Sequence, residues 1–238
     1  MAQTPYSANH VLASLPAPDL NVLLPHLRFV DLPQETLLFE SGGTVNRVYF
    51  PHSGIVSLVV ELKTGDMIEA AMIGREGVVG GLAALDHNIS ISRAIVQVAG
   101  SASAVEVDAV RRLGEQSAAF RTILIKHEQV LLAQSQQSAA CNATHTLEAR
   151  LSRWLLRCRD LLASDEIALT QEFVAQMLGV RRTSVSVVAN TLQQAGLIKY
   201  KRGNIRLLDL EGLRESACEC YGTVKALSDR LIGTSRSI

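Results

Sequence analysis

The chain has 238 residues, of which 47% are hydrophobic and 19% charged, a composition that excludes an intrinsically disordered protein and suits one large or two ordinary globular domains. Basic and acidic side chains number 23 each, so the net charge is zero and by itself argues against a nucleic-acid partner. Four cysteines do not make a disulfide framework in a chain of this length, and we expect reduced thiols in a cytoplasmic protein.

The N-terminal region is hydrophobic but interrupted by Pro16, Pro18 and Pro25, so we expect neither a signal peptide nor a membrane anchor. From about Phe29 to Val107, short β-prone runs alternate with turn residues, as in "TLLF", "RVYF", "IVSLVVEL" and "SRAIVQVAGSASAVEV". Several short strands at this spacing predict an antiparallel sandwich or roll.

Helical spacing begins after Asp108, where glycines become rare. Apolar and small residues then follow one another at intervals of three and four, which is the spacing of a heptad seam. A helix packed inside its own domain has the same pattern, but the length from Gln116 to Ala143 favours a partner helix from a second chain. We therefore expect a homodimer whose interface contains Phe120, Leu124, His127, Leu131, Gln134 and Ser138.

Two further helices are predicted beyond a second amphipathic segment that starts near Leu147. "LTQEFVAQMLGV" reads as a helix capped by Thr170 and ended by Gly179. After it, apolar residues recur at i, i+3, i+4 and i+7, which overrules the β propensity of the valines and places on one helical face Val185, Val188, Ala189 and Leu192. Two helices joined by a tight glycine turn predict a helix-turn-helix, whose second helix lies in the DNA major groove.

The polar residues Arg182, Ser186 and Gln193 of the second helix are then expected to face outward. Arg181, Thr183 and Ser184 are grouped at the N-terminal end of this helix. Arginine pairs bidentately with guanine, and hydroxyls can contact bases or phosphates. The following "LIKYKRGNIRLL" predicts two short strands around a turn at Gly203-Asn204, typical of a wing that holds phosphates. The residues expected to contact DNA are Thr170, Arg181, Arg182, Thr183, Ser184, Ser186, Lys199, Lys201 and Arg202.

The charge distribution agrees with this interpretation. Residues 1–143 carry 9 basic and 13 acidic side chains, whereas residues 144–238 carry 14 basic and 10 acidic ones. Between Arg181 and Arg206 there are six basic residues and no acidic residue. A solvated charged face is the alternative for such a run, but its place directly on a predicted helix-turn-helix favours attraction of a phosphate backbone.

Together, the β-rich N-terminal part, the long helix and the C-terminal winged helix-turn-helix resemble the Crp/Fnr family of bacterial transcription regulators. The resemblance covers nearly the whole chain. It is strongest in "LTQEFVAQMLGVRRTSVSVVANTLQQAGLI" and is also visible in "FESGGTVNRVYFPHSGIVSL", which is similar to the opening hairpins of the family's cyclic-nucleotide-binding-type β-roll. It implies an α+β fold with an antiparallel β-roll of jelly-roll type over residues 1–112, a dimerisation helix over 113–145 and a winged helix-turn-helix over 146–238.

The resemblance also implies partners and a base-reading residue. A member of the family would bind a two-fold symmetric site on double-stranded DNA as a homodimer, with RNA polymerase as a further partner. Arg182 falls on the family's base-reading arginine. Thr183 and Val187 stand where many members have a glutamate and a second arginine, so we expect a different half-site sequence.

Cyclic-nucleotide-binding members of the family hold the ligand with a Gly-Glu pair and an arginine. The corresponding positions of this chain are Gly80-Gly81 and, if Ala94 is aligned, Ser92, with Arg93 one residue away. On a strand, a shift of one residue turns a side chain to the opposite face. Without the glutamate and the arginine a buried phosphate lacks its partners, so we expect a vestigial or altered effector pocket that does not bind cyclic AMP.

Other kinds of site are not indicated. The cysteine cluster of an iron–sulfur sensor would lie near the N-terminus, whereas the first cysteine is Cys141. Cys218 and Cys220 would diverge if both lay on one helix, and we expect structural thiols, no metal and no cofactor. His127 could sense pH or metal, but a packed histidine is the simpler interpretation. No catalytic constellation is visible, so the main alternative to a transcription regulator is a small-molecule or second-messenger sensor in which DNA binding is secondary.

Overall fold

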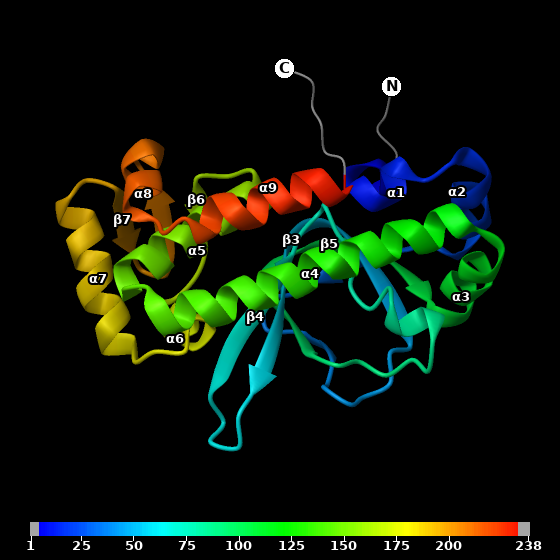
Figure 1. Cartoon of the computed structure of the whole chain (residues 1–238), viewed down its shortest axis with the longest axis horizontal. Coiled ribbons are helices and arrows are strands. Elements are labelled where there is room, and N and C mark those ends of the chain that lie inside the picture. Colours follow the sequence, from blue (N-terminus) through cyan, green and yellow to red (C-terminus); the bar gives the residue numbers. More distant parts are fainter. Residues whose placement is uncertain (1–4, 233–238) are drawn as a thin grey trace. The chain divides into compact units, whose positions relative to one another are not determined.

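A computed structural model of the chain describes residues 5–232 (Figure 1). Residues 1–4 of the predicted β-roll domain and residues 233–238 of the predicted winged helix-turn-helix domain lie outside this range. The described chain divides into two compact units. The first contains the described chain up to Leu58, Met72–Leu131 and residues 231–232, and the second contains Val59–Ala71 and Leu132–Arg230. No described helix combines the length and the apolar character needed to cross a lipid bilayer.

The first unit contains an antiparallel sheet, preceded by the short helices α1 (His10–Ser14) and α2 (Ala17–Leu23). Strand β5 pairs antiparallel with both β1 and β2, and the sheet order is β1-β5-β3-β4. The predicted mixed fold with an antiparallel β-domain is therefore confirmed. The strands are β1 (Arg28–Leu32), β2 (Leu37–Phe39), β3 (Arg47–Glu61), β4 (Met67–Ile73) and β5 (Arg93–Glu106).

The core of the first unit lies between its strands and the helices that follow them. Helix α3 (Val107–Gln116) buries one apolar side, and α4 (Ala118–Thr144) begins after a break at Ser117. The hydroxyl of Ser117 accepts a hydrogen bond from the backbone N–H of Phe120 at 3.1 Å, which satisfies a free donor in the first turn of α4. The buried cluster contains, among others, Leu12, Leu23, Phe50, Val110, Leu113, Phe120 and Leu124.

The face of α4 that carries the predicted dimer seam is buried within its own chain. Five of the six seam residues are at most 6% exposed, and Ser138 is half-buried. Phe120 and Leu124 belong to the core of the first unit, and Nε2 of His127 accepts a hydrogen bond from the backbone N–H of Val78 at 3.3 Å. The heptad spacing thus reflects packing inside the chain, the alternative that the sequence allowed, and it does not offer these side chains to a partner helix.

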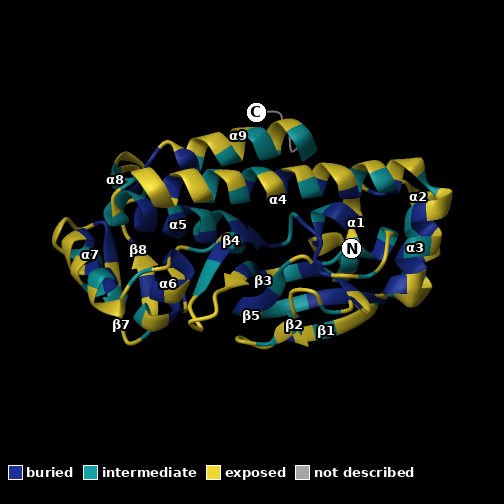
Figure 2. Cartoon of the chain, turned by 60° about the horizontal axis from the view of Figure 1, so that its bottom comes forward, coloured by how far each residue is buried: buried dark blue, intermediate teal, exposed yellow. Residues whose placement is uncertain are grey.

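The second unit contains the C-terminal helices and a three-stranded sheet of order β6-β8-β7. Figure 2 shows that its helices bury one side and expose the other. Its elements, besides the end of α4, are α5 (Leu147–Leu162), β6 (Glu166–Ile167), α6 (Gln171–Leu178), α7 (Arg182–Gln194), β7 (Ile198–Lys201), β8 (Asn204–Leu207), α8 (Leu210–Ser216) and most of α9 (Cys220–Ile232).

The tip of the β3–β4 hairpin also belongs to the second unit, which the sequence did not indicate. Trp154 of α5, the only tryptophan of the chain, donates from its indole nitrogen to the carboxylate of Glu69 at 2.9 Å, and both side chains are buried. At the end of α6, a Cβ on Gly179 would come within 3.0 Å of Ile68. The hairpin tip therefore packs closely against the helices α5 and α6.

Candidate DNA-binding interface

Helix α6 has the start and the end that its sequence predicts. The hydroxyl of Thr170 accepts a hydrogen bond from the N–H of Phe173 at 3.2 Å, so Thr170 is the N-cap. Gly179 follows the last turn with φ +62°, a left-handed conformation that glycine adopts without a steric penalty. The apolar side of α6 is buried, and a tight turn leads from Gly179 into α7.

Helix α7 buries the side that its apolar spacing predicts. Val185, Ala189 and Leu192 are almost completely buried, and Val188 is half-buried. The opposite side is open to solvent, as the outer surface of α7 in Figure 2 shows. At the N-terminal end of α7, the side chains of Arg181, Arg182 and Thr183 are exposed. The hydroxyl residue that follows them, Ser184, is half-buried.

Arg182 is held only loosely. Its Nε lies 4.0 Å from Oε2 of Glu172, and the two side chains are 67% and 65% exposed. An ion pair this exposed contributes between zero and about 1 kcal/mol, because water and salt screen it. The guanidinium can therefore exchange Glu172 for another hydrogen-bond acceptor at small cost.

Ser186 lies in a different environment from the one expected for a free base contact. Its hydroxyl is 2.6 Å from Oε1 of Gln171 and 3.1 Å from the carbonyl oxygen of Arg182. The single hydroxyl proton is thus used inside the protein, where it links α7 to the start of α6. Ser186 keeps only acceptor capacity for a ligand.

The hairpin after α7 is a two-stranded wing whose turn lies one residue earlier than predicted. Lys201 pairs with Asn204 across the strands, so the turn consists of Arg202 and Gly203, both with positive φ (49° and 77°). This is the geometry of a type I′ turn, which matches the twist of a hairpin but is unfavourable for arginine. The basic side chains of the wing, Lys199, Lys201, Arg202 and Arg206, are exposed.

Two hydrogen bonds attach the wing to the rest of the second unit. The backbone N–H of Tyr200 donates to Oε1 of Gln193 at 2.7 Å, and the phenol of Tyr200 donates to the carbonyl of Leu169 at 2.8 Å. Burial raises the pKa of Tyr200 to about 12. Gln193 is half-buried in this arrangement, so the expectation that it points outward is wrong; a polar residue in a helical pattern gives no sign of a contact with the strand that follows the helix.

In the first unit, the residues expected to form an effector pocket are packed against their own chain. Gly80 has φ +81°, and a Cβ there would lie 3.0 Å from both Phe39 and Val45. A Cβ on Gly81 would lie 3.0 Å from Leu124 of α4. The space for larger side chains is therefore already filled by apolar groups.

The other residues of the expected pocket, Ser92, Arg93 and Ala94, also contact groups of their own chain. Nε of Arg93 lies 3.4 Å from Oε2 of Glu40, and Ala94 is fully buried opposite Phe39 on β2. The carbonyl of Ser92 accepts a hydrogen bond from the hydroxyl of Ser90 at 2.6 Å. Elsewhere in this unit there is a pocket of about 340 Å³, lined by Leu38, Phe39, Thr44, Asn46, Arg47, Tyr49 and Glu106.

A helix-turn-helix followed by a basic wing defines a class of DNA-binding domains. Residues 149–216 match the family model described as the Crp-like helix-turn-helix domain. No curated protein sequence matches the chain. The chain is also similar to solved structures of Crp/Fnr regulators, and its resemblance to this family is confirmed in both its helix-turn-helix domain and its fold.

Three of these structures show how far the similarity extends. A transcriptional regulator of the Crp/Fnr family from Eubacterium rectale has a TM-score of 0.69 and 15% identity, covering 88% of this chain and 98% of that one. FixK2 from Bradyrhizobium japonicum has a TM-score of 0.69 and 16% identity, with 81% and 98% covered. The c-di-GMP responsive regulator CLP from Xanthomonas campestris has a TM-score of 0.65 and 17% identity, with 82% and 100% covered.

Proposed function

We propose that the protein is a homodimer that binds specific DNA sequences through α7 and the wing and thereby regulates transcription. The observation that carries this proposal is the arrangement of α7, which buries its valine side and leaves Arg181, Arg182 and Thr183 exposed at its N-terminal end. In a helix-turn-helix the N-terminal residues of the second helix contact base edges. RNA polymerase as a further partner stays a prediction.

The two kinds of basic residue have different roles in this proposal. Arg182 starts α7 and is tied only to the exposed Glu172, so it can form a bidentate pair with guanine. Lys199, Lys201 and Arg202 lie on the wing, where a lysine or arginine attracts phosphate without reading sequence.

The presence of Val187 supports a DNA half-site whose sequence differs from the one that family members with an arginine at this position bind. Its side chain is 67% exposed on the outer side of α7, where contact of an apolar group with water does not stabilise the protein. An apolar side chain in the major groove contacts the methyl group of thymine. We therefore expect a thymine preference next to the base that Arg182 reads.

The dimer contact in this proposal uses the exposed side of α4 and not the buried seam. Ile125 and Leu132 are 49% and 59% exposed, and they are seven residues apart, so they lie on the same side of the helix two turns from each other. A parallel copy of α4 would cover both. A two-fold symmetric dimer presents its recognition helices about 34 Å apart, which is one turn of DNA.

The effector in this proposal is not cyclic AMP. The glutamate and arginine that hold the nucleotide in the family are replaced by Gly81 and Ser92, and Leu124 closely approaches the position of a side chain on Gly81. Arg47, the cation lining the pocket of the first unit, is already paired with Glu106 at 2.7 Å. The Xanthomonas regulator, described as c-di-GMP responsive, is a neighbour in fold whose effector is also a different molecule.

A randomised-site binding experiment tests base reading. Arg182→Ala should cost about 1–3 kcal/mol per half-site and relax the preference at one base pair, because a bidentate base contact is lost. Lys201→Ala should weaken all sequences alike and make the dependence of log K on log salt shallower by about one, because a phosphate contact is lost.

The comparison of the two variants decides the role of α7. If Arg182→Ala lowers affinity uniformly while every base preference is kept, α7 does not read bases through this residue. If neither variant changes DNA affinity across the salt series, Arg182 and Lys201 do not contact DNA, and if the unaltered chain selects no DNA sequence from the library, the DNA-binding function itself is refuted.

A further inference from the structure

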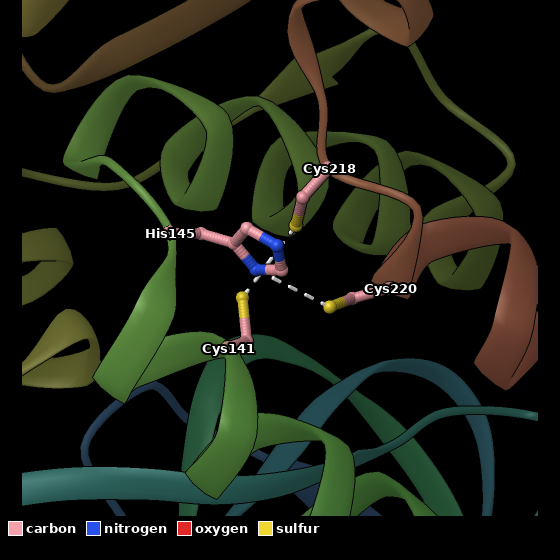
Figure 3. Close-up of side chains that lie close together, drawn as sticks. All are labelled: Cys141, His145, Cys218 and Cys220. Atoms are coloured by element: carbon pink, nitrogen blue, oxygen red, sulfur yellow. Dashed lines mark hydrogen bonds between the residues drawn. The ribbon is translucent and has the colours of Figure 1, made fainter.

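Three of the four cysteines and one histidine of the chain meet in the second unit (Figure 3). Cys141 lies in the last turn of α4 and His145 directly follows that helix, while Cys218 lies in the α8–α9 loop and Cys220 starts α9. Their sulfur atoms and one imidazole nitrogen all lie within 4.8 Å of one another. We call these four side chains the Cys3His cluster.

This arrangement corrects the expectation that Cys218 and Cys220 diverge. That expectation placed both residues on one helix, but α8 ends at Ser216 and Cys218 lies outside helical structure. A loop residue and the first residue of the next helix can direct their thiols to one point. Cys141 and His145, four residues apart on one helical turn, supply the other two groups from the same side.

Two distances within the Cys3His cluster are close to those around one tetrahedral ion. Sγ of Cys141 lies 3.5 Å from Sγ of Cys218, and Sγ of Cys220 lies 3.6 Å from Nδ1 of His145. With bonds of about 2.3 Å to sulfur and about 2.0 Å to nitrogen, tetrahedral zinc separates two sulfurs by about 3.8 Å and sulfur from nitrogen by about 3.5 Å. An iron–sulfur cluster spreads its thiolates over several irons, which requires a wider arrangement.

The neighbours of the Cys3His cluster have the chemistry of an outer ligand shell. Nε2 of His145 lies 3.3 Å from Oε1 of Glu219, a partner that would hold the proton on Nε2 and leave the lone pair of Nδ1 directed at the thiols. Nε2 of Gln137 donates a hydrogen bond to Sγ of Cys220 at 3.0 Å, a contact that stabilises negative charge on sulfur.

Positive charge also lies close to the thiols. Arg150 is buried and interacts electrostatically with Cys141 and Cys218. Arg153 interacts with Cys141, and its buried Nε has no hydrogen-bond partner among the described residues. A zinc ion with three thiolates and a neutral imidazole carries one net negative charge, which these guanidinium groups would balance.

We infer that the Cys3His cluster binds one zinc ion, as a closed structural site with four protein ligands. The ion joins the end of α4 to the segment that follows the winged helix, and so connects helices that are about 75 residues apart in sequence. Because zinc binds the folded arrangement and not an extended chain, occupancy stabilises the second unit. The buried environment of all three cysteines fits a structural role.

Metal analysis of the full-length protein, expressed with zinc and purified under reducing conditions, tests this inference. We expect about one zinc per chain. After replacement by cobalt, the protein should show the strong visible d–d bands of tetrahedral Co²⁺ together with thiolate-to-cobalt charge transfer. This spectrum is recorded on the unaltered chain and does not depend on whether a variant folds.

Variants then assign the ligands. In competition with a chromophoric chelator, Cys218→Ser and His145→Ala should lower zinc affinity by more than the roughly 10–100-fold that we expect for the outer-shell variant Glu219→Gln. Cys158→Ala is the matched control: it removes the remaining cysteine, which is buried in α5 outside the cluster, and should keep zinc at full affinity.

Two results would overturn the inference. One is a reduced full-length protein that takes up neither zinc nor cobalt, or that gives the weak spectrum of octahedral cobalt. The other is a Cys218→Ser variant that holds zinc as tightly as the unaltered chain. Either result would leave the three cysteines as packed thiols.

Discussion

The β-domain of the first unit and the winged helix of the second unit use their polar side chains in opposite ways. In the β-domain, the residues expected to bind an effector are packed against apolar groups or paired with other residues of the domain, as Gly81 beside Leu124 and Arg93 beside Glu40 show. On α7 and the wing, basic side chains extend into solvent, and Arg182 has only a weak partner. A surface that binds phosphate must keep its cations available, whereas a packed interior cannot.

The same contrast separates the two sides of α4. Phe120 and Leu124 lie in the core of the first unit, whereas Ile125 and Leu132 are open to solvent. The buried side follows a heptad spacing because it packs along its own chain, and the two exposed residues, seven positions apart, are the contact that we propose for a partner helix. Five experiments test which surfaces serve the fold and which serve binding.

The largest effect is expected from Phe120→Ala, which removes a fully buried ring from the core of the first unit. The free energy of unfolding should fall by about 3–5 kcal/mol, because apolar contacts are lost and a cavity is left. Urea unfolding measures it. The control Ile91→Ala changes a residue that is 90% exposed and should stay within about 0.5 kcal/mol of the unaltered protein. Equal stability of the two variants would refute the burial of Phe120.

Leu132→Asp tests the exposed side of α4. It should leave the protomer folded but raise the dimer dissociation constant at least about a hundredfold, or about 2.7 kcal/mol, because a charge enters the apolar contact. Analytical ultracentrifugation measures it. Leu208→Asp, the same change at a residue that is 54% exposed outside α4, should leave the dimer intact. A Leu132→Asp variant that stays dimeric would exclude this face.

Tyr200→Phe tests the attachment of the wing. Loss of the hydrogen bond to Leu169 should cost about 0.5–1.5 kcal/mol of unfolding free energy at neutral pH. The folded pKa of Tyr200, about 12, is above its ordinary value of 10.0, so its contribution is complete below pH 10 and is lost as pH rises toward 12. Urea unfolding at pH 9 and pH 11 should therefore show a steeper loss in the unaltered protein than in the variant. Parallel losses would contradict the burial of this phenol.

Arg202→Asn separates fold from binding at one position. Asn-Gly is the preferred pair for a type I′ turn, so relief of the left-handed arginine should raise stability by up to about 1 kcal/mol. DNA affinity should nevertheless fall, with a salt slope shallower by about one, because a phosphate contact is lost. Thermal unfolding and binding across a salt series measure the two effects. A variant that is more stable and binds DNA unchanged would remove Arg202 from the interface.

The smallest effect is expected from cyclic AMP, which at millimolar concentration should change neither the melting temperature nor DNA affinity. A ligand present at one hundred times its dissociation constant would stabilise the protein by about 2.7 kcal/mol. Thermal unfolding with and without the nucleotide therefore gives a clear answer. An increase of several degrees would show that the β-domain binds cyclic AMP without the glutamate and the arginine.

Local sequence patterns determined most of the helix-turn-helix and its wing. Thr170 and Gly179 mark the ends of α6, and the spacing of Val185, Ala189 and Leu192 identifies the buried side of α7, because caps and helical periodicity act within a few residues. The antiparallel strands followed from short β-prone runs between turn residues. The turn of the wing was misplaced by one residue, since Arg202 has a backbone conformation that its residue type disfavours.

Only the tertiary structure decided the remaining features, because they join residues far apart in sequence. A heptad spacing is the same for a helix that packs on its own core and for one that pairs with another chain, so the sequence could not decide whether its own chain or a partner covers the seam side of α4. Trp154 and Glu69 are 85 residues apart, and Cys141 and Cys218 are 77 residues apart. Neither pair produces a periodic pattern in the sequence. Which distant residues come together depends on how the whole chain folds.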